Sequence, residues 1–362
     1  MLTHVLFFVL GIVALIAGAE ALVRGASKIA LSLGISPLVV GLTIVAVGTS
    51  SPEVAVSVGA VLNGSTDIAV GNVVGSNILN VLLILGISAL IAPLVVHSQL
   101  IRQEVPIMIG ASLLLVVMVL DGKLGRLDAA LLAILLAGYM VFLVMQSRAE
   151  SAEIRDEYAE SVCRPGEWDS HWAVQALLIV IGLGLLVLGS DWLVESSIAF
   201  ARAMGVSDLI IGLTIIAAGT SMPELAASIM AAVRGERDIA VGNVIGSNTF
   251  NILGCLGISG LVSRDGLSIA PAVLNFDLWV MVAVAVACLP VFIAGREIGR
   301  RKGLLFVGYY VAYVAYLILG AQDHDALDEY SAIMIGFVLP ITVVTLVAML
   351  IRNQSRQGDT SS

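Results

Sequence analysis

Residues 41–86 read GLTIVAVGTSSPEVAVSVGAVLNGSTDIAVGNVVGSNILNVLLILG, and residues 212–257 read GLTIIAAGTSMPELAASIMAAVRGERDIAVGNVIGSNTFNILGCLG. The offset between the two stretches is 171 throughout, without a gap, and 28 of the 46 aligned positions are identical. Shared apolar composition would give far fewer identities, so the two halves of the chain are copies of one unit. The helices before these stretches match more loosely at the same offset, which pairs Glu20 with Asp191.

The composition of the chain places the repeats in a membrane. Of the 362 residues, 59% are hydrophobic and only 12% are charged, whereas soluble proteins are nearer half apolar and a quarter charged. A bilayer core about 30 Å thick needs about 20 apolar residues per helix, and we predict eleven such spans. They are roughly 3–23, 37–62, 68–92, 104–120, 127–146, 172–194, 208–233, 239–262, 277–294, 303–320 and 331–351.

Each repeat contains five of these predicted spans. Because five is an odd number, the second copy enters the membrane from the opposite side, and inverted repeats of this kind are typical of secondary transporters. We therefore predict an all-α polytopic membrane protein with two inverted five-helix repeats, which form a ten-helix core, plus one extra C-terminal helix. The predicted divisions are the first repeat at 1–146, a cytoplasmic linker at 147–171, the second repeat at 172–320, and an acidic outer loop, the extra transmembrane helix and a C-terminal tail at 321–362.

The basic residues predict the orientation of the chain in the membrane. With the N-terminus outside and the C-terminus in the cytoplasm, 14 of the 18 Lys and Arg residues fall on the cytoplasmic side and four on the outer side. The net charge of −9 is diffuse, so we expect no nucleic-acid partner, and nothing in the sequence points to a protein partner.

The motif G-T-S-x-P-E occurs once in each repeat, near the middle of an apolar span, at residues 48–53 and 219–224. Proline has no N–H and its ring clashes with the carbonyl four residues earlier, so each motif releases a backbone carbonyl. At membrane depth such a carbonyl must find a partner or line a cavity. Each motif also ends on an acid, Glu53 or Glu224, and a charge at the bilayer centre costs about 3 kcal/mol. We expect the two acids to meet between the repeats and to bind a cation.

The second shared motif is G-N-V-x-G-S-N-x-x-N, at residues 71–80 and 242–251. Its serine and its last asparagine are four residues apart, so Ser76 and Asn80 lie on one helix face, as do their counterparts in the second repeat. Together the two motifs offer the carboxylate, carbonyl, hydroxyl and amide oxygens that hard cations prefer. The glycines at a spacing of four are also typical of close helix packing, and both uses stay open.

On these two motifs the chain resembles the calcium/cation antiporter superfamily, and in particular its prokaryotic sodium/calcium exchangers, over ten of the eleven spans. The resemblance implies secondary active antiport of Ca2+ against Na+ by alternating access in a prokaryotic inner membrane, with the first and sixth helices sliding against the core. It implies no cofactor; Ca2+ and Na+ are the transported ions, and the lipid bilayer is the other partner. The ligands that it implies are the carbonyls of Ala46 and Ala217 and the side chains of Thr49, Thr220, Ser50, Ser221, Glu53, Glu224, Ser76, Ser247, Asn80 and Asn251.

One position departs from the family pattern, because several relatives carry Asp where this chain has Asn251. The predicted site therefore has two carboxylates, which Ca2+ would neutralise. The number of Na+ ions and any use of K+ stay open.

Three other functions are compatible with parts of the pattern. A Ca2+/H+ or K+-linked antiporter would share the fold, although the G-N-x-x-E core typical of the proton exchangers is absent. A membrane enzyme with Ser50 or Ser221 as nucleophile would need a base, and all four histidines fall at span ends or in loops. A passive channel is the third alternative, and a flux assay without a counter-gradient would separate it from an antiporter.

Overall fold

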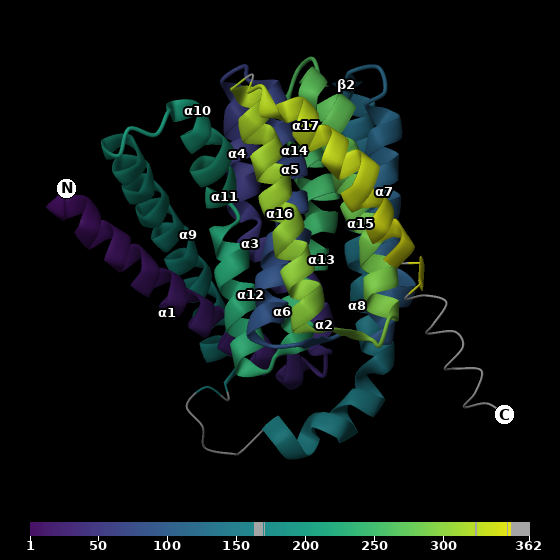
Figure 1. Cartoon of the computed structure of the whole chain (residues 1–362). Coiled ribbons are helices and arrows are strands. Elements are labelled where there is room, and N and C mark those ends of the chain that lie inside the picture. Colours follow the sequence, from purple (N-terminus) through teal and green to yellow (C-terminus); the bar gives the residue numbers. More distant parts are fainter. Residues whose placement is uncertain (163–168, 170, 323, 346, 349–362) are drawn as a thin grey trace.

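The computed structural model describes residues 1–162, 169, 171–322, 324–345 and 347–348, and Figure 1 shows it as a bundle of long helices. Within this described part, ten helical stretches are long and apolar enough to cross a membrane. The predicted all-α, polytopic fold class is confirmed. The stretches are Leu2–Leu33, Pro37–Leu62, Thr66–Ile91, Leu100–Met118, Arg126–Ser147, Trp172–Ala203, Arg237–Val262, Val273–Ile293, Arg300–Ala321 and Ala326–Thr345.

The remaining predicted span, residues 208–233, is helical but interrupted. It consists of α10 (Asp208–Ile211), the π-helical η4 (Gly212–Ile216), α11 (Ala217–Gly219) and α12 (Met222–Arg234). Its counterpart in the first repeat has the same build, with α2 (Pro37–Val40), η1 (Gly41–Val45), α3 (Ala46–Thr49) and α4 (Ser51–Leu62). Both interruptions fall just before the proline of G-T-S-x-P-E, because proline is tolerated in the first turn of a helix but not in its interior. The matching build makes this segment the eleventh crossing.

Several helices extend beyond the predicted spans, because apolar composition marks the part in lipid rather than the whole helix. One of them is α9 (Trp172–Ala203), which continues past the predicted end at residue 194. α1 (Leu2–Leu33) continues past the predicted end at residue 23 and stops at Gly34, whose φ of 67° is typical of a helix C-cap. α8 (Arg126–Val162) continues through the first part of the predicted linker. α17 (Ala326–Ile333) begins before the predicted start at residue 331 and leads into η7 (Met334–Val338). Most of the remaining linker and the end of the C-terminal tail lie outside the described residues.

Short strands tie the loops of one repeat to those of the other. β1 (Leu94–Val95) pairs antiparallel with β4 (Glu297–Ile298), and β2 (Lys123–Leu124) pairs antiparallel with β3 (Leu267–Ser268). The sequence analysis did not predict these strands. The other helical elements are α5 (Thr66–Leu79), η2 (Asn80–Ile84), α6 (Leu85–Ile91), η3 (Leu100–Glu104), α7 (Val105–Met118), α9 (Trp172–Ala203), α13 (Arg237–Phe250), η5 (Asn251–Cys255), α14 (Leu256–Val262), η6 (Val273–Asp277), α15 (Leu278–Ile293) and α16 (Arg300–Ala321).

α1 and α9 form an antiparallel pair beside the other helices. Their backbones touch at glycines: a Cβ added at Gly18 would lie 2.8 Å from the carbonyl oxygen of Gly182, and one at Gly189 would lie 2.8 Å from that of Gly11. Small residues permit this close approach between membrane helices. We call the end of the bundle where α8 ends the linker face. Figure 1 shows the pair lying obliquely and nearest to the other helices at this face, where α1 contacts α12 and α2.

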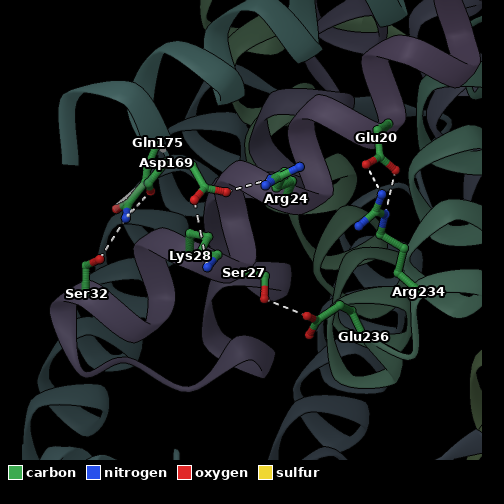
Figure 2. Close-up of polar contacts among 9 residues, drawn as sticks. All are labelled: Glu20, Arg24, Ser27, Lys28, Ser32, Asp169, Gln175, Arg234 and Glu236. Atoms are coloured by element: carbon green, nitrogen blue, oxygen red, sulfur yellow. Dashed lines mark hydrogen bonds and ion pairs between the residues drawn. The ribbon is translucent and has the colours of Figure 1, made fainter. Parts of the chain in front are cut away.

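Polar side chains hold α1 against the start of α9 at the linker face (Figure 2). Arg24 Nε donates to Asp169 Oδ2 at 2.6 Å, Lys28 Nζ lies 3.9 Å from Asp169 Oδ1, and Gln175 donates to Ser32 Oγ at 2.9 Å. Burial alone would raise the pKa of the Asp169 carboxyl, but the hydrogen bond from Arg24 and the charges of Lys28 and Arg24 outweigh it and lower that pKa. The two helices are therefore joined along their lengths and at this end.

The two repeats are packed differently although their sequences match. A Cβ added at Gly41 in η1 would lie 2.9 Å from the carbonyl oxygen of Ile239 in α13, so these backbones are in contact. At the equivalent Gly212 in η4, an added Cβ would meet no described atom within 4 Å. Ile239 is 0% exposed, whereas its counterpart Ile68 in α5 is 52% exposed. Among the described residues, the bundle is thus closed around η1, on the linker side of the two shared motifs, and open around η4, on the opposite side.

Candidate cation site

Four irregular points of the helices meet inside the bundle. Two are the interruptions before the prolines. The other two are π-helical turns that start at the last asparagine of the second motif, η2 at Asn80 and η5 at Asn251. α4 contacts η5, and α12 contacts η2. The helix that follows the interruption in each repeat therefore packs against the π-helical turn of the other repeat. π-helical turns within α-helices are frequent at functional sites, and here they coincide with the predicted ligands.

The carboxylates of Glu53 and Glu224 lie between the repeats, and both are fully buried. Each accepts a hydrogen bond from a serine of the other repeat: Ser221 Oγ donates to Glu53 Oε1 at 2.9 Å, and Ser50 Oγ donates to Glu224 Oε1 at 2.8 Å. Ser221 Oγ also lies 3.2 Å from Ser76 Oγ. The structure therefore brings both predicted acids and three of the predicted serines to one place.

Several buried oxygen atoms at this place have no hydrogen-bond partner within the described residues. A buried polar atom without a partner costs about 1–3 kcal/mol, and most are paired. All of these atoms belong to predicted ligands, and oxygen is the donor atom that Ca2+ prefers. They are Glu53 Oε2, Glu224 Oε2, Asn80 Oδ1, Asn251 Oδ1 and Ser247 Oγ.

The site is poor in acids compared with many metal sites. No group of three or more His, Cys, Asp or Glu side chains suited to a metal ion occurs among the residues that the structure describes. A cation at this place would therefore be bound by two carboxylates and by neutral oxygens, which suits an ion that must also leave.

The predicted threonines and the residues with predicted carbonyl ligands differ in burial between the two repeats. Thr49 and Ala46 are buried, whereas the equivalent Thr220 is half-buried and Ala217 is exposed. Thr49 Oγ1 also donates to the carbonyl of its own helix at Val45, at 3.0 Å. Thr220 and Ala217 thus lie toward the open side around η4, whereas the other predicted ligands of the second repeat, Ser221, Glu224, Ser247 and Asn251, are buried.

Two asparagines that the sequence analysis did not count as ligands orient two that it did. Asn80 Nδ2 donates to Asn248 Oδ1 at 3.0 Å, and Asn251 Nδ2 donates to Asn77 Oδ1 at 3.2 Å. Asn77 and Asn248 in turn each donate to the backbone carbonyl of the other at 3.2 Å. Because the amide nitrogens are held in this way, the carbonyl oxygens of Asn80 and Asn251 stay free.

A second pair of missed asparagines braces the helices behind the site. Asn72 Nδ2 donates to Ser57 Oγ at 3.1 Å in its own repeat, and Asn72 Oδ1 accepts from Thr220 at 3.3 Å in the other repeat. Asn243 makes the equivalent contacts in the second repeat. The sequence could have indicated both pairs. Each of these asparagines occurs in both repeats, in an apolar helix where its polar atoms need hydrogen-bond partners.

An inverted-repeat membrane bundle with buried carboxylates and unpaired oxygens between its repeats is the architecture of a secondary cation transporter. The sodium/calcium exchanger protein family model matches residues 3–145 and 174–319 of this chain. The chain belongs to this family.

Relatives and solved structures agree with this assignment. The chain is 39% identical to the putative antiporter CaxA of Alkalimonas amylolytica, over 89% of this chain and 100% of the relative. It is 34% identical to the sodium/calcium exchanger MaX1 of Methanosarcina acetivorans, over 86% and 97%. A structure of the sodium-calcium exchanger NCX_Mj soaked with Na+ and Ca2+ matches with a TM-score of 0.74 and 30% identity, over 87% of this chain and 98% of that one.

These matches decide between the broad alternatives. The chain is a membrane antiporter of the Ca2+/cation exchanging class, and it is not an enzyme. The ions that it moves are substrates rather than cofactors.

Proposed function

We propose that this protein exchanges Ca2+ for Na+ and that both ions bind between Glu53 and Glu224. The observation that carries the proposal is the set of unpaired buried oxygens, which come from both repeats and include one from each glutamate. Ca2+ takes six to eight oxygen ligands at about 2.4 Å. Two carboxylates neutralise its charge, and the free amide and hydroxyl oxygens extend the ligand set. Na+ also prefers oxygen, with half the charge.

Obligate exchange follows from the charge of the site. Without an ion, two carboxylates would lie uncompensated at membrane depth, and moving them through the low-dielectric core is costly. With Ca2+, or with Na+ bound at the same carboxylates, the charge is reduced and the protein can change conformation. Because both ions need the same two acids, they compete, and one leaves before the other binds.

We further propose that access alternates between the membrane faces as the α1–α9 pair moves against the other helices. The separate packing of this pair and the unequal closure of the two repeats support that motion. We place the linker face in the cytoplasm of a prokaryote, with the N-terminus outside, because 14 of the 18 basic residues fall on that side.

Transport in proteoliposomes tests the coupling. Purified protein is reconstituted with internal Na+, then with internal K+, and then with an imposed pH gradient, and uptake of radioactive Ca2+ is measured. We expect uptake with internal Na+ and only background uptake with the other two. Uptake driven by the pH gradient alone would replace Na+ coupling by H+ coupling, and uptake without any counter-gradient would indicate a channel.

A further inference from the structure

Among the described residues, two polar contacts join α1 to the helices outside the α1–α9 pair at the linker face (Figure 2). Arg234, at the end of α12, donates through Nε and Nη2 to the two carboxylate oxygens of Glu20 in α1, at 2.5 Å for the Nε contact. Ser27 Oγ in α1 donates to Glu236 Oε1, just before α13, at 2.6 Å. An arginine that binds a carboxylate through two parallel hydrogen bonds fixes the geometry of both groups. The contacts to Asp169, by contrast, join α1 to the turn just before α9 and not to the other helices.

The internal repeat shows what lies at the equivalent place on the opposite face. At the offset of 171, Glu20 corresponds to Asp191, and Arg234 corresponds to Asn63. At the equivalent place on the opposite face, an acid is therefore present but the arginine is replaced by an asparagine. The second contact has no equivalent either, because its serine corresponds to Ile198. In the structure, neither Asp191 nor Asn63 makes a side-chain hydrogen bond or ion pair with any described residue.

The packing of the repeats gives these contacts a role. The structure is closed around η1, on the linker side, and open around η4. In inverted-repeat transporters the two repeats exchange conformations between the two access states. In the other state, α9 would approach α4 as α1 now approaches α12, and an acid would then face an asparagine rather than an arginine.

We propose that the Glu20–Arg234 pair, supported by the Ser27–Glu236 contact, is a latch that favours the conformation closed at the linker face. The proposal rests on the proposed function only in requiring two access states. Arg234 and Glu20 are 43% and 32% exposed, and ion pairs with such exposure are weakened by salt and contribute modestly. The latch therefore shifts the balance between the two states and does not lock either one, so that bound ions can still change the conformation.

The distance between α4 and α9 at the opposite face tests the latch without any transport. Spin labels are attached to cysteines at Leu62 and Met204, in a variant that lacks the three native cysteines. Both positions are well exposed, at 72% and 75%. Their counterparts at the closed face, Val233 and Leu33, are also exposed, at 63% and 54%, so the labels would not obstruct closure. Double electron–electron resonance then gives the fractions of long and short distances in lipid nanodiscs without Ca2+ or Na+.

We expect the long distance, open at the opposite face, to predominate in the otherwise native protein. Glu20→Gln and Arg234→Gln should each raise the ratio of short to long distances by about threefold, as loss of an exposed ion pair would. The exchanged pair, Glu20→Arg with Arg234→Glu, should restore the native ratio. Asn63→Arg should also raise the ratio, by giving Asp191 a partner, and added Asp191→Asn should cancel that increase.

A matched control separates a latch from general loosening of α1. Arg24→Gln removes an ion pair of the same kind on the same helix, but one that joins α1 to the turn just before α9, so the distances should not change. High concentrations of a salt without Na+ or Ca2+ should raise the ratio in the native protein, because salt screens the Glu20–Arg234 ion pair. The same salt should have no further effect in Arg234→Gln, which lacks that pair. Unchanged distances in both Glu20→Gln and Arg234→Gln would overturn the latch. Because these distances are measured without Ca2+ or Na+, that result would not test Na+ coupling. A failure of Na+ coupling in the transport assay would likewise not change these distances.

Discussion

At the scale of single residues, the candidate site is marked by buried oxygen atoms that have no hydrogen-bond partner within the described residues. Glu53 and Glu224 each use one carboxylate oxygen to accept from a serine of the other repeat and leave the second unpaired. The serine bonds fix the orientation of each carboxylate, while the second oxygen of each has no hydrogen-bond partner within the described residues. A cation can therefore enter without first displacing a hydrogen bond at those atoms.

Removing either charge should abolish transport. Glu53→Gln and Glu224→Gln keep the shape of the side chain and can still accept from the serines, but each halves the negative charge available to Ca2+. We expect Ca2+ uptake in proteoliposomes to fall to background in each variant, with unchanged gel-filtration profiles. Near-normal uptake by either folded variant would show that the two acids do not share one site.

The paired asparagines lead to a finer prediction. Asn248→Ala removes the acceptor that holds Asn80, so the amide can turn and its carbonyl oxygen is no longer oriented. Loss of such an outer partner typically lowers metal affinity by roughly 10–100-fold, and we expect Ca2+ affinity to fall within this range. Thr249→Ala is the control, since Thr249 is buried beside Asn248 but bonds only the carbonyl of Ile245 in its own helix, at 3.1 Å. Equal affinities for the two variants, measured by calorimetry, would exclude an orienting role for Asn248.

The sequence was enough to predict the candidate ligands that the structure places close together, but not which of their polar atoms are hydrogen-bonded and which are unpaired. Two acids at matching depth in inverted repeats have no apolar explanation, so Glu53 and Glu224 could be predicted. Asn77 could not be separated from Asn80 in this way, because both are buried amides of one motif. Only the hydrogen-bond directions show that the first holds an amide and the second leaves a carbonyl oxygen free.

At the scale of helices, the two repeats share their motifs but pack differently. Gly41 contacts α13 through the backbone, whereas Gly212 faces open space within the described part of the structure. The shared motifs cannot reveal which copy is packed, because the motif residues themselves are the same in both repeats. The sequence analysis left open whether the motif glycines serve packing or ion binding. In the second repeat, a Cβ at Gly242 would lie 2.9 Å from the carbonyl oxygen of Leu38, so packing is one of their uses.

Alanine at the two equivalent glycines should therefore have different effects. Gly41→Ala places a methyl group 2.9 Å from the Ile239 carbonyl oxygen, and overpacking of this kind costs about 1–3 kcal/mol. We expect amide hydrogen exchange in residues 37–49 to rise by about tenfold or more in lipid nanodiscs. Gly212→Ala should leave exchange in residues 37–49 unchanged. Equal protection in both variants would contradict the unequal packing of the repeats.

At the scale of the whole molecule, duplication, composition and odd helix number were enough to predict the architecture, and the structure and the family confirm the fold class. The strand ties between repeats and the contacts between Glu20 and Arg234 were not predictable, because they join residues that are distant in sequence and follow no periodic pattern. Orientation rests on charge alone. Two of the basic residues counted for it, Arg24 and Lys28, lie on α1 at the linker face (Figure 2).

Thiol labelling tests this orientation. A cysteine at position 156, in the variant without native cysteines, should resist impermeant thiol reagents in intact cells and react after the membrane is made permeable. A cysteine at Asp121, which is exposed in the loop between α7 and β2, should react from outside and serves as the matched control. The reverse pattern would invert the orientation while leaving the repeats and the site intact.

The central claim is that Na+ and Ca2+ compete for one site that contains both glutamates. Its most direct test is equilibrium binding of Ca2+ to the purified protein, titrated with Na+ at constant ionic strength, with choline and K+ as replacements. We predict that Na+ displaces Ca2+ at concentrations where choline and K+ do not, and that Glu53→Gln and Glu224→Gln each lose Ca2+ binding. Displacement by Na+ that is no better than displacement by choline would contradict the account and leave H+-coupled exchange as the reading to test next.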